Sequence, residues 1–117
     1  MLQTQLLAEV ITVDAAEDIE QYRLINLDGH LAAATTPKVL GVSQIKATSG
    51  MPLSVALQGG LLFVTASAAI AAKAAICATT GGKAKTVSTA QGSTDVVQGY
   101  TLDEAKADGD LIRIILN

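Results

Sequence analysis

The segments GMPLSVALQ (Gly50–Gln58) and GDLIRIILN (Gly109–Asn117) can be superimposed without a gap, and this match decides the predicted fold. Their apolar side chains then coincide at every second position. The coincident pairs are Leu53 with Ile112, Val55 with Ile114, and Leu57 with Leu116. Because side chains on one face of a β-strand recur with a period of two, both segments are predicted to be strands with one buried face. Such a repeat indicates a chain built from two related halves.

Each half also contains a tight-turn signal upstream of its matching strand, followed by a lone glycine after an aliphatic pair. The first half has Asp28-Gly29 and then Gly41, and the second half has Gly81-Gly82 and then Gly99. Asp-Gly and Gly-Gly dipeptides suit primed hairpin turns, which need positive φ angles. Each half is therefore predicted to be a meander of three or four short strands.

Short segments with strand character, separated by turn signals, recur along the whole chain. We predict strands near Glu9–Val13, Tyr22–Asn26, Leu31–Ala34, Val39–Ile45, Leu53–Leu57, Leu61–Thr65, Ala75–Ala78, Ala84–Thr86, Val97–Leu102 and Leu111–Leu116. Short strands with turn signals about every 8 to 12 residues are typical of a sandwich or barrel. The expected fold is mainly β: a small β-sandwich or barrel of short strands built from two related halves, roughly residues 19–58 and 70–117.

One segment, Ser67–Ala74, is expected to be helical rather than extended. It is rich in Ala, which favours helix, and it opens with Ser, which can cap a helix. We therefore expect one short Ala-rich helical segment there. The longer apolar run Leu61–Ala78 is not expected to span a membrane, because it contains Lys73 and is dominated by weakly apolar Ala.

The length and composition predict one small domain with an aliphatic core. The chain has 117 residues, half of them apolar, but only one Phe, two Tyr and no Trp. We assign residues 1–8 to an N-terminal arm and residues 9–117 to a single β-rich domain. Large aromatic side chains bury the most area per residue, and this chain has few of them. We therefore expect its core to gain stability when the chain associates with other chains.

The charge balance and the single cysteine exclude several classes of protein. A formal net charge of −3 and no basic cluster argue against nucleic-acid binding, which needs clustered Lys and Arg. Cys77 is the only cysteine, so no intramolecular disulfide is expected, and a small buried apolar role is favoured. The first residues, MLQTQLLAEVITVD, lack the features of a secretory signal. We therefore expect synthesis in the cytoplasm.

Residue patterns for catalysis are weak. His30 is the only histidine and directly follows the Asp28-Gly29 turn, so it is interpreted as an exposed turn residue. A pair of Cys77 with His30 is conceivable because their hairpins correspond in the two halves, but nothing in the sequence places them together. A general base needs an orienting partner and an adjacent nucleophile. No catalytic residue is assigned.

Three further patterns are explained without ligand chemistry. Ser43–Lys46 matches S-x-x-K, but without the partner motifs of penicillin-binding enzymes. TTGGKAKT (Thr79–Thr86) lacks the leading glycine and the Ser or Thr after Lys83 that a phosphate loop requires. Four acidic residues do not follow a calcium-loop spacing and are interpreted as a solvated loop. They are Asp103, Glu104, Asp108 and Asp110. No metal or cofactor is expected.

Five stretches carry a family resemblance. They are EVITVDAAEDI (Glu9–Ile19), VLGVSQI (Val39–Ile45), TASAAIAA (Thr65–Ala72), GGKAKTV (Gly81–Val87) and ADGDLIRIILN (Ala107–Asn117). In this order the chain resembles the capsid decoration or cement proteins of tailed phages, which are small, rich in Ala and Gly and built of short strands. Lys73-Ala74 stands where such proteins often have a Gly-Asp pair.

The resemblance implies a binding function without catalysis or cofactors. It implies a homotrimer that is seated on the outer surface of the virion and binds the major capsid protein. This trimer would bridge neighbouring coat subunits. Two alternatives stay open. One is another phage assembly module, such as a tail or fibre part. The other is a small-molecule-binding or enzymatic β-barrel that uses Cys77 and His30.

The N-terminal arm, Met1–Ala8, is the predicted capsid contact. Leu2, Leu6 and Leu7 flank the polar run Gln3–Gln5, and the arm has no counterpart in the second half. An extended arm can add to the edge of a coat-protein sheet, where backbone hydrogen bonds set the register and leucines fill pockets. The alternative is that the arm folds over its own sheet.

Overall fold

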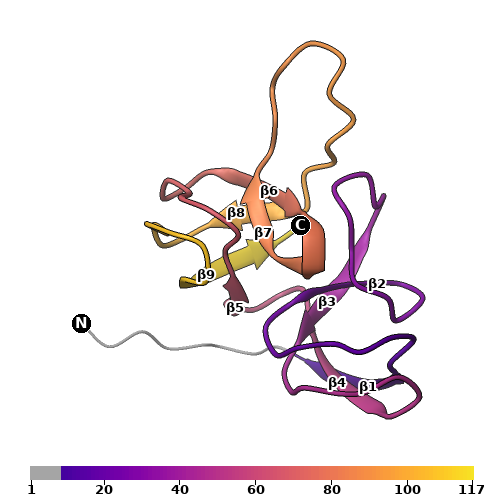
Figure 1. The fold of residues 1–117 in the computed structure, drawn as a ribbon. Coiled ribbons are helices and arrows are strands. Elements are labelled where there is room, and N and C mark those ends of the chain that lie inside the picture. The colour runs from indigo at the N-terminus through magenta and orange to yellow at the C-terminus, as the bar shows by residue number, and fades with distance from the viewer. Residues whose placement is uncertain (1–8) are drawn as a thin grey trace.

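A computed structural model describes residues 9–117, and this part of the chain folds into nine short β-strands (Figure 1). The strands are β1 (Val10–Asp14), β2 (Leu24–Asn26), β3 (Val39–Ser43), β4 (Pro52–Leu57), β5 (Leu62–Thr65), β6 (Ala75–Ala78), β7 (Ala84–Thr86), β8 (Gly99–Thr101) and β9 (Leu111–Leu116). The helical element of the described residues is the 3₁₀ turn η1, Thr80–Gly82. The predicted mainly β fold of short strands is confirmed.

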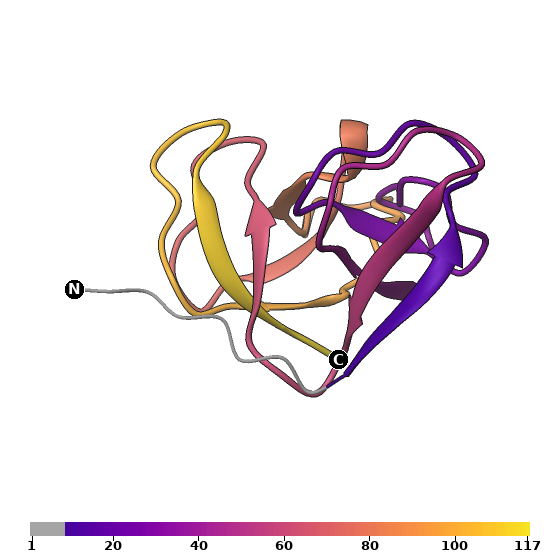
Figure 2. The same cartoon turned by 90° about the horizontal axis from the view of Figure 1, so that it is seen from below.

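The strands form two antiparallel sheets, one from each half of the chain. The first has the order β1-β4-β3-β2 and the second the order β5-β9-β8-β6-β7. Figure 2 shows the two sheets as neighbouring lobes, with β1 and β4 on one side and β5 and β9 on the other. In each sheet the last strand of the half, β4 or β9, lies between the half's first strand and its glycine-containing strand.

The two halves repeat the same backbone pairing outside their strands. Ile19 and Ala47 exchange both backbone hydrogen bonds in the first half, and Ile70 and Ala105 do so in the second. Three residues after each of these isoleucines the backbone takes a left-handed conformation, with φ of 61° at Tyr22 and 61° at Lys73. Each half therefore crosses from its first to its second strand along the same path.

A buried hydroxyl holds this crossover in both halves. Ser43 at the end of β3 and Thr101 at the end of β8 are both buried. Each hydroxyl accepts a hydrogen bond from one backbone N–H of the crossover and donates one to a carbonyl. The donors are Arg23 N and Ala74 N, at 3.0 and 2.9 Å, and the acceptors are Glu20 O and Ala71 O, at 2.7 and 2.8 Å. The polar side chain thus satisfies backbone groups that the strands leave unpaired.

The predicted helix at Ser67–Ala74 is wrong. Ile70 gives its N–H and its carbonyl to Ala105, Ser67 donates to the Ala84 carbonyl, and Lys73 has a positive φ. A helix needs these backbone groups for bonds within the segment. Hydrogen bonds to residues far away in the same chain therefore override the helical propensity of alanine. That propensity is worth only about 0.5 kcal/mol per residue over most other residues.

The predicted strand at Leu31–Ala34 is also wrong. Leu31 forms a single bridge with Ile25, and Ala32 donates to the Leu24 carbonyl. The chain then turns, because Thr36 donates to the Ala33 carbonyl and its hydroxyl accepts from the Ala33 N–H. This turn ends the pairing after one bridge.

The apolar interior consists of two clusters. The larger joins both halves: it contains Val42 and Ala56 of the first sheet together with Leu62, Val64 and Ile114 of the second. The smaller lies under the other face of the first sheet, around Ile19, Leu53 and Val55. The two halves thus share the larger cluster as a common core. Tyr22 and Phe63 also meet edge to face at 5.7 Å between ring centroids, one from each half.

Candidate functional site

The two residues considered for chemistry, His30 and Cys77, lie in different surroundings. His30 is exposed, and its Nδ1 lies 2.9 Å from Oε2 of Glu17. Cys77 is fully buried on β6. Burial, reinforced by the nearby Asp95 carboxylate, raises the pKa of the Cys77 thiol. Because the thiolate is the reactive form, a raised pKa makes this thiol a poor nucleophile.

Cys77 is the register partner of Lys85 on β7. The ion pair of Lys85 with Asp95 fastens the long loop between β7 and β8, which projects from the molecule in Figure 1. Lys85 Nζ lies 3.0 Å from Oδ2 of Asp95, and the Ser88 N–H donates to the same oxygen at 2.8 Å. The Ser88 bond, together with that from Lys85, holds the pKa of Asp95 below its usual range. The same carboxylate raises the pKa of Lys85. The ion pair is structural, because it joins Lys85 on β7 to Asp95 in the loop.

The S-x-x-K and glycine-rich patterns also have structural roles. Ser43 is buried, and its hydroxyl is engaged with the crossover backbone as described above. Gly81 and Gly82 form the η1 turn with φ of 75° and 72°, and the Gly81 carbonyl accepts a hydrogen bond from Arg23 at 3.0 Å. This glycine turn therefore binds the first half to the second.

Most of the acidic residues near the C-terminus bond within the chain. Asp103 takes two hydrogen bonds from the Arg113 guanidinium, both at 2.9 Å, and Asp108 lies 2.9 Å from Lys83 Nζ. Asp110 accepts from the backbone of Lys106 and Ala107. Among residues 9–117 no group of three or more His, Cys, Asp or Glu side chains could hold a metal ion.

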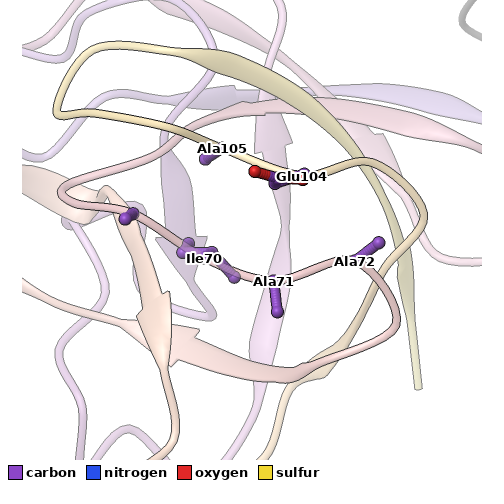
Figure 3. A pocket seen from close by; sticks show the side chains of 6 residues that line it. Ile70, Ala71, Ala72, Glu104 and Ala105 are labelled. Carbon is purple, nitrogen blue, oxygen red and sulfur yellow. The ribbon is translucent and has the colours of Figure 1, made fainter.

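The hollows of the described surface are open to solvent. One of about 410 Å³ is lined by Ala69–Ala72, Glu104 and Ala105. Figure 3 shows Ile70, Ala71 and Ala72 on one segment, beside Glu104 and Ala105 on another. A second, of about 470 Å³, lies at the junction of the halves, between Leu31–Ala34 and Thr79–Gly81. Ligand pockets are generally clefts or cavities that bury most of the ligand, whereas both of these hollows are open, so neither is assigned a ligand.

Comparison with known proteins decides the family. A family model described as phage cement protein matches residues 3–116, nearly the whole chain. The chain belongs to the phage cement protein family. It is accordingly a structural protein of the phage head, located in the virion. No curated protein matches the sequence of this cement protein.

A solved structure has the same fold as this cement protein. It is the N base of the head fiber gp8.5 in bacteriophage phi29, with a TM-score of 0.69 and 19% sequence identity. The match covers 93% of this chain and 93% of that one. At this identity the likeness extends to the arrangement of strands alone.

The predicted capsid-contact residues of the cement protein, Leu2, Leu6 and Leu7 in the arm 1–8, lie outside the described residues. Within residues 9–117, no helix is both long and apolar enough to cross a membrane.

One apolar surface of the cement protein is not among the sites predicted from the sequence. Three side chains of the second sheet, Tyr100, Leu111 and Ile115, point outward and are 49%, 38% and 49% exposed. Together they define the β8–β9 face. A signal for it was present, because LIRIIL (Leu111–Leu116) has apolar residues on both alternations whereas a half-buried strand needs them on only one.

Proposed function

We propose that this cement protein binds the outer surface of a phage capsid, bridges neighbouring coat subunits and so stabilises the shell, without catalysing a reaction. The observation that carries the proposal is the match to the cement family over residues 3–116. The bonding of the described polar groups supports it. The side chains that resembled catalytic motifs, such as Ser43 and Cys77, are buried and serve the fold.

Bridging requires a partner surface and a way to hold more than one coat subunit. The partner we propose is the major capsid protein, contacted through the arm Met1–Ala8 with Leu2, Leu6 and Leu7 as anchors. An arm that adds a strand to a coat-protein sheet gains backbone hydrogen bonds along its length. The protein is made in the host cytoplasm and added to the shell from outside.

A homotrimer is the proposed assembly. The aromatic-poor composition supports it, because a core of aliphatic residues gains stability when additional apolar surface is buried between copies. Cyclic symmetry closes the contacts between copies. Three arms held together also bind with greater avidity than a single arm, because the second and third contacts form within one assembly.

The decisive experiment uses capsids that lack the protein. Purified protein is added, its position is mapped by cryo-electron microscopy, and the temperature at which packaged DNA escapes is measured with and without it. We expect density on the outer surface between coat subunits and a higher release temperature. Failure of the protein to bind such capsids would refute the proposal. Density at a tail or fibre would favour the alternative assembly role.

A further inference from the structure

The internal repeat identifies a surface that is covered in the first half and open in the second. Tyr100 and Ile115 are register partners across β8 and β9. Val42 and Ala56 are the register partners at the same positions of β3 and β4. Both residues of the first-half pair are completely buried, whereas both residues of the second-half pair are 49% exposed. The same sheet position is thus interior in one half and surface in the other.

The first-half pair is buried in the core that the two halves share. Val42 and Ala56 belong to the same apolar cluster as Leu62, Val64 and Ile114 of the second half. Each half is thus one module of the repeat, and the second module packs against the sheet of the first. Within residues 9–117 no element covers the equivalent face of the second sheet, so Tyr100 and Ile115 remain half-exposed.

The open face has the chemistry of a protein contact. It carries Tyr100, one of three aromatic residues in the chain, and aromatic residues are enriched in the centres of interfaces. Arg113 lies between Leu111 and Ile115 along β9, and its charge is neutralised by the two hydrogen bonds to Asp103. The Arg113 and Asp103 side chains are already only 16% and 17% exposed, so a partner that covers this face removes little further water from them and leaves neither charge unpaired.

We propose that the β8–β9 face, Tyr100, Leu111 and Ile115, is the surface through which one copy of this chain contacts a second copy. A second copy is the expected partner because of the repeat. In the first half the equivalent face is covered by the other half of the chain, and a second copy supplies a further half of the same kind. The inference rests on the proposed trimer and deepens it by naming the contact surface.

The test compares the full chain with the double variant Tyr100→Thr/Ile115→Thr. Threonine retains strand propensity, so the sheet is expected to form. The control is Leu27→Thr, which removes a large apolar side chain that is 64% exposed on a turn of the first half. Sedimentation equilibrium over a wide concentration range gives the average mass, and thermal unfolding shows that each variant folds.

We expect the native chain and Leu27→Thr to associate with rising concentration, and the double variant to raise the dissociation constant by more than about tenfold. A native chain that stays monomeric, or a folded double variant that associates like the native chain, would overturn the inference. Capsid binding is measured separately. A monomeric native chain whose capsid binding is lost in the double variant would assign the face to the coat protein instead. Failure of the native chain to bind capsids would count against the proposed function alone.

Discussion

Gly41 and Gly99 show how single residues allow the sheets to pack. A Cβ atom built on Gly41 would overlap the backbone carbonyl oxygen of Ala56, and one built on Gly99 would overlap that of Ile115. Both of these oxygens are backbone atoms, so they can move only if the strand moves. These are the two glycines that the sequence comparison placed at the same position of each half, and close strand approach is the physical reason for both.

Gly41→Ala and Gly99→Ala are each expected to lower the free energy of unfolding by about 3 kcal/mol or more, because the new methyl group must displace a strand. Gly92→Ala is the control. It has a φ of 83° but nothing within 4 Å of its Cβ position, so it should cost only about 1 kcal/mol. Urea unfolding measures all three. Equal losses at the three positions would contradict the steric explanation.

Asp95 makes the stability of the β7–β8 loop depend on pH. Because folding lowers the pKa of Asp95, its stabilisation is present above the unfolded value of about 3.9 and is lost as pH falls through the folded value. The native chain should therefore be more stable than Asp95→Asn near neutral pH, and the difference should close in acid, below about pH 4. Urea unfolding of both proteins across this range tests it. A difference that stays constant with pH would show that the carboxylate charge is not the cause.

At the scale of elements, the predictable parts were those in which local pattern and tertiary pairing agree. Ala75–Ala78, Ala84–Thr86 and Leu111–Leu116 have the predicted boundaries, because alternation or turn residues bound them on both sides. Ser67–Ala74 was misassigned because its path is fixed by Ala105, which lies far away in the sequence. The β8–β9 face was missed for a related reason: alternation tells which residues share a face but not which face is covered.

Lys73 gives a test of the crossover conformation. It is exposed with a φ of 61°, where a side chain is strained and glycine is not, and the family resemblance places a glycine at this point. Lys73→Gly is expected to raise the free energy of unfolding by about 0.5 kcal/mol, the relief of strain less the entropy that glycine adds to the unfolded chain. Lys73→Ala, which removes the same side chain without relieving the strain, should give no gain. Equal stability of the two variants would show that the crossover is not strained.

At the scale of the whole molecule, two modules with the same crossover are fused into one structure with different surfaces. The alanines Ala68, Ala69, Ala71 and Ala72 line the second crossover, where the first has mostly acidic and polar residues, among them Glu17, Asp18, Glu20 and Gln21. The shared core covers the sheet of the first module, and the sheet of the second stays open. Two related modules with different surfaces give this chain more than one kind of exposed face, which is what the proposed bridging between coat subunits requires.

The arm Met1–Ala8 supplies the last prediction, which separates capsid binding from folding. Both sheets and both cores are formed within residues 9–117, so deletion of Met1–Leu7 should leave thermal unfolding and self-association unchanged. If Leu2, Leu6 and Leu7 fill pockets of the coat protein, the deletion should weaken capsid binding by at least about tenfold.

Leu6→Asp with Leu7→Asp should mimic that deletion, because burying a carboxylate in an apolar pocket is costly. The matched control, Gln3→Asp with Gln5→Asp, adds the same charge at polar positions and should bind nearly as well as the native chain. Amide exchange in the arm should slow when the protein binds capsids. If the truncated chain binds capsids undiminished, the arm is not the anchor, and the contact moves to the loops around Gly50 and Gly109, which the repeat places at the same turn of each half.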